Sequence, residues 1–185
     1  MAILVLDTSV IFDLERGGLL EAAFSLDYTF VAPDLLYRNE LESDPVGPQL
    51  IELGLEIVEL DGTEVEAAQA VARERKGLSR PDCWAMVCAR REGYRLVCGD
   101  ARLRGYAESE AIECSGLLWI LDRICDAELL TPETLVQALT RIRKHGRARL
   151  PKDEVENRLA KWAAASGQTR ERAPRAYANI PQKAK

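Results

Sequence analysis

The sequence predicts an α/β protein in three layers, with a central, mostly parallel sheet and helices on both of its faces. The first observation behind this class is an alternation along the chain. Short apolar runs, rich in β-branched and aromatic residues, take turns with segments of helical pattern. The second is size, because a chain of 185 residues that is 47% apolar can bury a core within one domain.

The strands are expected where the apolar runs are short and bounded by turn residues. They are residues 2–6, 28–32, 55–60 and 94–99, with one further short strand at 111–116. The helical patterns between the first four strands cover residues 18–26, 34–43, 48–53, 63–76 and 81–92. Gly77 and Gly93 stand where helices are expected to end, since glycine readily adopts the left-handed conformation found there.

Beyond residue 100 the pattern is mainly helical. Helices are expected at 117–130 and 132–146, the second with Thr131 as its N-cap, and an amphipathic segment follows at 152–163. From Gly167 the low apolar content predicts a basic flexible tail. The chain is thus expected to divide into a main domain (1–126), a helical C-terminal extension (127–166) and the tail (167–185).

Several classes of protein are disfavoured by what the sequence lacks. No apolar run reaches the roughly 18 to 20 residues that span a bilayer, and the N-terminus has no signal-peptide pattern. We therefore expect a cytoplasmic protein with no membrane partner. The five cysteines are odd in number and show no C-x-x-C spacing, which favours buried free thiols. The single histidine, His145, lies in a basic helix end, which disfavours a catalytic triad.

The net charge of −5 conceals two parts of opposite sign. Residues 1–140 carry a net charge of −14, and residues 141–185 carry one of +9. An acidic body with a basic C-terminal region predicts contact with a polyanion or an acidic partner. The alternative is a solvated terminus without a partner.

Two aspartates directly follow predicted strands. Asp7 closes the first strand, and Asp100 closes the run YRLVCGD in the same way. Because the carboxyl ends of parallel strands share one edge of a sheet, these carboxylates are expected to meet in one crevice. Taken singly, either aspartate could instead cap a helix or start a turn.

Two further acids occupy helical positions. Glu40 lies in the helix that follows the second strand, where it could also be a solvated residue, and Glu42 is the alternative to it. Asp82 lies three residues after Ser79 at the start of a helix. That spacing also matches a capping box, which stabilises a helix start with or without any chemistry.

In order and spacing, the segments LVLDTSV, APDLLYRNEL, LSRPDCWAMVCAR and LVCGDARL resemble the acidic motifs of the PIN domain family, over residues 2 to about 125. The resemblance implies a PIN-like three-layer α/β/α sandwich. It assigns Asp7, Glu40, Asp82 and Asp100 to the catalytic, metal-binding quartet and Ser9 to the supporting hydroxyl residue near the first acid. It also implies a ribonuclease similar to the toxins of VapBC-type modules, which an antitoxin protein holds inactive.

The chemistry of such a quartet agrees with that resemblance. Four carboxylates in one pocket repel one another, and Mg²⁺ or Mn²⁺ relieves the repulsion because these ions prefer oxygen ligands. The expected function is metal-dependent endonucleolytic cleavage of single-stranded RNA, with the toxin of a type II toxin–antitoxin module as the expected role. Cys98 stands where the family commonly has a hydroxyl residue. Two alternatives therefore stay open: a catalytically weak nucleic-acid or protein-binding module, and an RNA-processing nuclease without an antitoxin.

Two expectations concern partners. The helix at 117–130 carries apolar residues on more than one face, which predicts a homodimer, with burial in its own domain as the alternative. These residues are Leu117, Leu118, Ile120, Leu121 and Ile124. The basic region from Arg141 onward is expected to assist RNA binding without taking part in cleavage, because the acidic body repels phosphate. The competing interpretations are that it docks an antitoxin or is an idle tail.

Overall fold

The structure, a computed structural model, describes residues 2–145 and 148–172, with side chains as far as Ser166. Its centre is a parallel sheet made of β1 (Ile3–Leu6), β2 (Thr29–Pro33), β3 (Glu56–Val58), β4 (Tyr94–Val97) and β5 (Cys114–Ser115). The strand order is β3-β2-β1-β4-β5, and every pairing in it is parallel. The predicted α/β class is confirmed.

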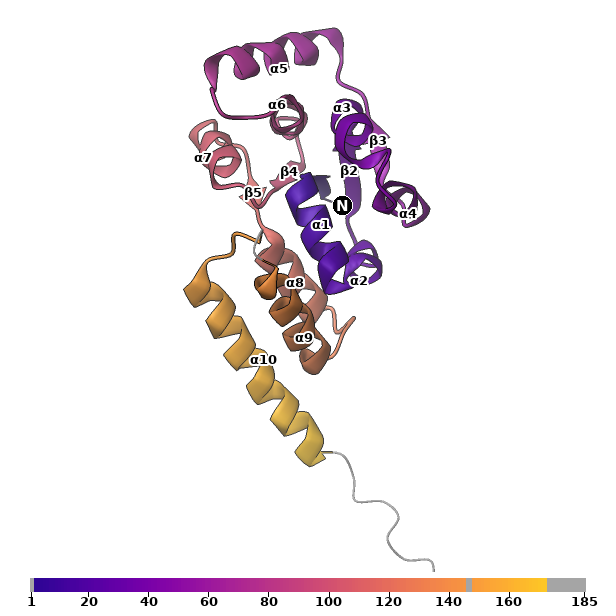
Figure 1. Cartoon of the computed structure of the whole chain (residues 1–185), viewed down its shortest axis with the longest axis vertical. Helices are drawn as coiled ribbons and strands as arrows, with labels where there is room; N and C mark the ends of the chain where they lie inside the picture. The colour runs from indigo at the N-terminus through magenta and orange to yellow at the C-terminus, as the bar shows by residue number, and fades with distance from the viewer. Residues whose placement is uncertain (1, 146–147, 173–185) are drawn as a thin grey trace, which may run out of the picture.

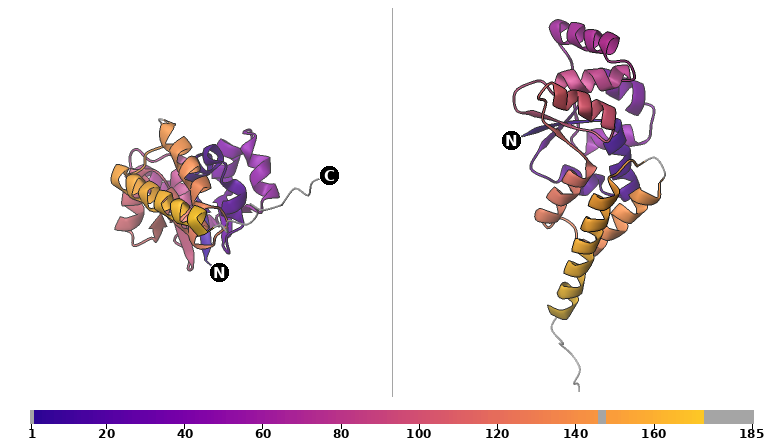
Figure 2. Two further views of the ribbon diagram at one scale, coloured as in Figure 1. Left: turned by 90° about the horizontal axis from the view of Figure 1, so that it is seen from below. Right: turned by 90° about the vertical axis from the view of Figure 1, so that its left-hand side faces the viewer.

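Helices flank this sheet in a three-layer α/β/α arrangement (Figure 1, Figure 2). Those before β4 are α1 (Thr8–Gly17), α2 (Leu20–Phe24), α3 (Asp34–Leu36), the π-helix η1 (Tyr37–Leu41), α4 (Val46–Glu52), α5 (Gly62–Glu74) and α6 (Arg80–Cys88). Those after β4 are α7 (Ala101–Ser109), α8 (Leu117–Asp126), α9 (Pro132–Lys144) and α10 (Lys152–Arg172). Helix α6 packs directly on β1, β2 and β4 and so brings Asp82 close to the sheet.

Helix α1 differs from the prediction, which placed the first helix at 18–26. Residues 8–11 include three β-branched side chains directly after an apolar strand, so the local pattern favours an extended chain. In the fold, Val10, Ile11 and Leu14 are fully buried at helical spacing. Gly18 ends the helix with a φ of 66°, a conformation that glycine adopts at little cost.

The predicted helix at 34–43 is present but irregular. It begins as α3 and continues as η1, in which the Glu42 N–H donates to the Tyr37 carbonyl oxygen, five residues earlier, at 2.8 Å. Such π-helical turns are rare and often occur at functional sites. Glu40 lies within this turn, so the irregularity sets the direction of a predicted site residue.

The C-terminal helices share the core of the sheet domain. Helix α9 packs against α1, and α10 packs against α9. Leu139 and Ile142 of α9 and Trp162 of α10 are buried in the same hydrophobic cluster as the strands. The division of the chain at residue 126 stays a prediction.

The predicted tail falls mostly beyond the part of the chain that the structure describes. Helix α10 continues through Gly167, where the tail was predicted to start, as far as Arg172. Residues 173–185 lie outside the described residues, as do Gly146 and Arg147. The prediction that cations of the tail assist RNA binding therefore stays a prediction.

The apolar face of α8 has an explanation within the single chain. The five side chains that suggested a homodimer are between 0% and 5% exposed. Burial in their own domain accounts for them, so the predicted homodimer has no support from this helix. The five cysteines are free, as expected, but only Cys83, Cys88 and Cys98 are buried, whereas Cys114 and Cys125 are half-buried. In the described part of the chain, no helix is long and apolar enough to cross a membrane.

Candidate active site at the carboxyl ends of the strands

Asp7 lies at the topological switch point of the sheet, where the strand order changes direction. The chain places β2 on one side of β1 and β4 on the other, and in open parallel sheets ligands bind in the crevice at such a point. The Asp7 N–H donates to the Val97 carbonyl oxygen at 3.0 Å, which fixes the residue at the strand end. Its side chain makes no capping hydrogen bond to α1. The main hydrogen bond of its carboxylate comes instead from the Ser9 hydroxyl, and the backbone of Ser9 has a smaller effect on its pKa.

The carboxylate of Asp7 is buried and held by Ser9. The residue is 4% exposed, and the Ser9 hydroxyl donates a hydrogen bond to its Oδ2. The same hydroxyl accepts the Gly99 N–H at 3.0 Å, which connects the end of β1 to the loop after β4. Burial raises the pKa of Asp7 to about 6, although the Ser9 hydrogen bond opposes that rise.

Two other predicted acids lie near enough to act on Asp7. The negative charges of Asp82 and Glu40 both raise the pKa of the Asp7 carboxyl, after the larger effect of burial. The effect of a like charge falls with distance, and the low dielectric of a protein interior strengthens it. The charges of Asp7, Glu40 and Asp82 therefore interact, although these three carboxylates do not lie close enough together to hold one ion.

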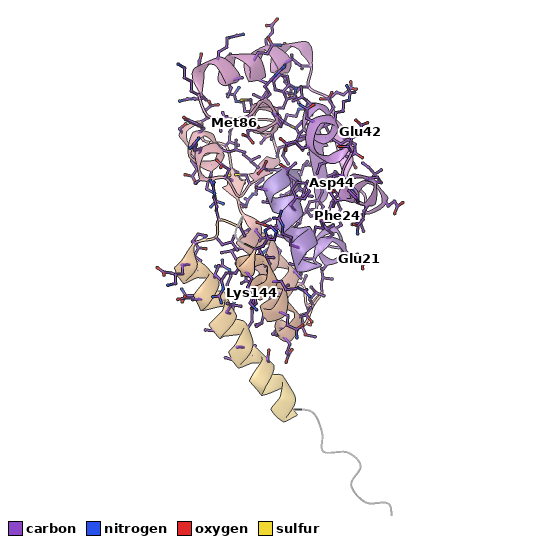
Figure 3. The ribbon with its side chains drawn as sticks, viewed as in Figure 1. Glu21, Phe24, Glu42, Asp44, Met86 and Lys144 are labelled. Carbon is purple, nitrogen blue, oxygen red and sulfur yellow. The ribbon has the colours of Figure 1, made fainter. Side chains whose placement is uncertain are left out.

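Glu40 is tied to the end of β1 by a long-range contact. The Thr8 hydroxyl donates to Glu40 Oε2 at 2.5 Å. Glu40 is half-buried, whereas Glu42 is exposed on the outer side of the molecule (Figure 3). The geometry thus favours Glu40 over Glu42 as the site residue.

Asp82 has a structural role as well. The Ser79 side chain accepts the Asp82 N–H at 3.1 Å, and Asp82 Oδ2 accepts the Ser79 N–H at 2.7 Å. This is the capping box that the spacing predicted. Its negative charge also raises the pKa of Asp7, so one carboxylate both caps α6 and acts electrostatically on the site.

Asp100 lies on the β4 side of the crevice. Its Oδ1 accepts the N–H groups of Arg102 and Leu103 at 2.8 and 3.0 Å, so it is the N-cap of α7. Its Oδ2 lies 3.8 Å from a guanidinium nitrogen of Arg149. Asp100 directly follows Gly99, whose N–H donates to the Ser9 hydroxyl. Because the same hydroxyl contacts Asp7, Ser9 connects the loop that carries Asp100 to the end of β1.

A pocket of about 470 Å³ opens beside Asp100. It is lined by Thr8, Ser9, Phe12, Asp13, Arg16, Gly99, Asp100, Leu117, Arg149 and Leu150. Sequence reasoning missed Asp13 and Arg16, since the helix that carries them was not predicted. Asp13 is 6% exposed, burial raises its pKa, and Arg16 donates to it at 2.8 Å in opposition to that rise.

The acids fit a hard divalent cation by their chemistry. Within residues 2–145 and 148–172, no three His, Cys, Asp or Glu side chains lie close enough together to hold one ion. Mg²⁺ does not require so many protein ligands, because it keeps several waters and is usually bound by one or two carboxylates. A buried Asp7 with acidic neighbours supplies that kind of donor set.

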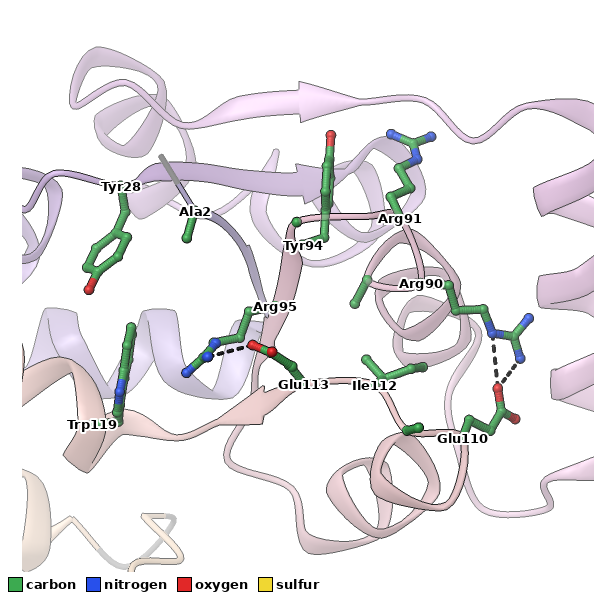
Figure 4. Close-up of a pocket in the computed structure, with 13 residues that line it drawn as sticks. Ala2, Tyr28, Arg90, Arg91, Tyr94, Arg95, Glu110, Ile112, Glu113 and Trp119 are labelled. Atoms are coloured by element: carbon green, nitrogen blue, oxygen red, sulfur yellow. Dashed lines mark hydrogen bonds and ion pairs between the residues drawn. The ribbon is translucent and has the colours of Figure 1, made fainter.

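A larger pocket, of about 690 Å³, lies at the other end of the strands, away from Asp7 (Figure 4). It is formed at the amino ends of the strands, around Tyr28, Tyr94 and Trp119. Its arginines are engaged by carboxylates, as in the pairs Arg90–Glu110 and Arg95–Glu113. This pairing leaves little positive charge for an anionic ligand, in contrast to the exposed Arg149 near Asp100.

The fold and the crevice define an α/β protein whose acids gather at the carboxyl ends of parallel strands. A family model described as a PIN domain matches residues 3–164, which is most of the chain. The chain therefore belongs to the PIN domain family, whose members are generally nucleases that act on nucleic acids and typically use divalent metal ions. No curated protein matches this sequence.

Proposed function

We propose that this protein is a divalent-metal-dependent endoribonuclease that cleaves phosphodiester bonds of single-stranded RNA. The observation that carries the proposal is the Asp7 carboxylate, buried at a strand end beside Glu40 and Asp82, with its pKa raised to about 6. A carboxylate held in this way destabilises the fold unless it has a cationic partner. Perturbed carboxylates in a crevice are typical of catalytic sites.

The residues around the acids act as supports in this mechanism. Asp7, Glu40, Asp82 and Asp100 are the proposed ligands and catalytic groups, and Asp7 is the central one. Ser9 holds the Asp7 carboxylate and Thr8 holds the Glu40 carboxylate, so both acids keep their orientation before RNA arrives. When bound, Mg²⁺ or Mn²⁺ neutralises carboxylate charge and lowers the pKa of water, which supplies a nucleophile at neutral pH.

The biological role that we propose is the toxin of a type II toxin–antitoxin module, acting in the cytoplasm. The alternative nuclease, an RNA-processing enzyme without an antitoxin, would use the same residues. A small open reading frame beside the gene, whose product co-purifies with this protein and stops cleavage, would favour the toxin. Absence of such a product would favour the processing enzyme.

The binding-module alternative has a specific observation in its favour. Cys98 replaces the usual hydroxyl residue, and its thiol is buried against the Cys114 sulfur at 3.5 Å. That position therefore offers no hydroxyl group to the acidic crevice. The Ser9 hydroxyl, which does contact Asp7, supports the nuclease instead.

A cleavage assay separates these functions. The full chain is incubated with end-labelled single-stranded RNA and Mg²⁺ or Mn²⁺, and we expect cleavage that EDTA abolishes. Asp7→Asn keeps the size of the side chain but removes a charge, so it should lose at least about 100-fold in rate. The matched control is Asp27→Asn, because Asp27 is exposed. Wild-type activity in Asp7→Asn would refute the proposed role, and RNA binding without cleavage in the wild type would favour the binding module.

A further inference from the structure

Part of the wall of the pocket beside Asp100 comes from a segment that is remote in the sequence. Arg149 and Leu150 belong to the connection between α9 and α10, and they line the pocket together with Ser9 and Asp100. Packing of α9 on α1 brings this connection to the carboxyl edge of the sheet. The basic C-terminal region therefore contributes one defined cation to the candidate active site.

Arg149 differs from the neighbouring arginines in how its guanidinium is used. Arg16 donates to Asp13 at 2.8 Å, and Arg141 donates to the Gly17 carbonyl oxygen at 2.5 Å. The Arg149 side chain is 80% exposed and lies 3.8 Å from Asp100 Oδ2, which is too long for a hydrogen bond. Its donors consequently remain available for a ligand in the pocket.

The rest of the pocket has the chemistry of a nucleotide site. Phe12, Leu117 and Leu150 provide an apolar wall, and Thr8 and Ser9 provide hydroxyl groups. A volume of about 470 Å³ is in the range of small-molecule sites and accommodates one nucleotide. Arginine binds phosphate through two parallel N–H groups, and bases lie against apolar or aromatic side chains.

We infer that this pocket is a nucleotide subsite next to the scissile bond, in which Arg149 binds a backbone phosphate and Phe12 with Leu150 holds the base. The inference rests on the proposed ribonuclease function and names where the substrate lies. Asp100 Oδ2 lies 3.8 Å from Arg149, and Asp100 is also one of the proposed ligands of the divalent cation. Removal of Arg149 should therefore weaken RNA binding and strengthen cation binding, a combination that a purely structural residue does not produce.

RNA affinity tests the phosphate contact independently of cleavage. The measurement uses fluorescence polarisation of a labelled single strand of about 12 nucleotides, with Asp7→Asn as the background so that the RNA stays intact. Arg149→Gln should raise the Kd about 5- to 30-fold and lower the salt dependence by about 0.7 log units per log unit of salt. Arg73→Gln is the matched control, because Arg73 is exposed on α5, does not line the pocket and lies outside the basic C-terminal region.

Cation binding tests the geometry without any RNA. Manganese electron paramagnetic resonance on the full wild-type chain and on Arg149→Gln gives the Mn²⁺ affinity directly. We expect the variant to bind Mn²⁺ about 2- to 5-fold more tightly, since a nearby positive charge has been removed at a partly exposed site. Arg73→Gln should leave this affinity unchanged.

The apolar wall is tested with Phe12→Leu and, should that variant fold poorly, with Leu150→Ser. Either substitution should raise the RNA Kd about 5- to 100-fold without changing the salt dependence, because a contact with a base is lost while the phosphate contacts remain. Equal RNA affinities for Arg149→Gln and Arg73→Gln, or no binding by the parent, would overturn the inference. Failure of the wild type to cleave RNA that it binds would overturn the proposed function alone.

Discussion

The Thr8 hydroxyl donates a hydrogen bond of 2.5 Å to the Glu40 carboxylate, although the two residues are 32 positions apart. Thr8 begins α1 at the end of β1, and Glu40 lies in the π-helical turn after β2. The contact therefore fixes one acid of the candidate site relative to the strand that carries Asp7. The contact also distinguishes Glu40 from Glu42, two residues further along the chain, and mutation of each residue tests this distinction.

Glu40→Gln should lower RNA cleavage by at least about 10-fold, because it removes a charged ligand while the Thr8 contact can persist. Glu42→Gln is the matched control, with the same chemical change on an exposed side chain, and its activity should stay within twofold of wild type. The cleavage activity of Thr8→Val should lie between those of Glu40→Gln and Glu42→Gln, since the Glu40 carboxylate remains but loses its hydrogen bond. Greater loss in Glu42→Gln than in Glu40→Gln would show that the site residue has been misassigned.

Asp7→Asn should stabilise the metal-free protein at pH 7.5. The pKa of Asp7 is about 6 in the folded protein and 3.8 in the unfolded chain. Between pH 3.8 and about 6 the native state therefore keeps a proton that the unfolded state releases. The wild type thus loses stability as pH rises from about 4 to 6, and at pH 7.5 the variant should gain about 2–3 kcal/mol.

Urea unfolding at pH 7.5 and at pH 4, in EDTA, measures this difference, which should fall to about 0.5 kcal/mol at the lower pH. Added Mn²⁺ should then stabilise the wild type more than Asp7→Asn. A variant that is less stable than wild type at pH 7.5 would mean that other contacts favour the Asp7 charge.

Ser9→Ala should move the acid limb of the pH–rate profile to higher pH. The Ser9 hydrogen bond lowers the pKa of Asp7, so its removal raises that pKa and delays formation of the carboxylate. The Gly99 N–H also loses its acceptor, which should cost about 1–3 kcal/mol of stability. Ser9→Thr, which keeps the hydroxyl group, should restore the wild-type limb, and an unchanged profile in Ser9→Ala would contradict the assigned contact.

Trp162→Ala should destabilise the whole protein by about 3–5 kcal/mol, because this side chain is 1% exposed in the shared core. Trp162→Phe should cost much less, since the indole Nε1 is buried without a hydrogen-bond partner in the described structure. Thermal unfolding followed at both near- and far-ultraviolet wavelengths should give one transition for each variant. Separate transitions would support an independently folding extension at 127–166.

The sequence by itself determined the features that depend on neighbours along the chain. The apolar runs predicted the strands, and the strand ends predicted Asp7 and Asp100. The Ser79–Asp82 capping box and the Thr131 N-cap were readable for the same reason, since their hydrogen bonds span three residues. The resemblance to the PIN family gave Glu40 and Ser9 their expected roles, and the match over residues 3–164 confirmed the family.

Tertiary structure alone decided the features that depend on distant packing. Helix α1 forms because its apolar stripe is buried, against the local preference of its β-branched start. The Thr8–Glu40 contact required a π-helical turn that no short pattern specifies. Arg149 reaches Asp100 because α9 packs on α1, and that contact spans 49 positions of the chain. Hydrophobic periodicity records which side of an element is buried, but it does not record against which partner, so these relationships emerge only when the core assembles.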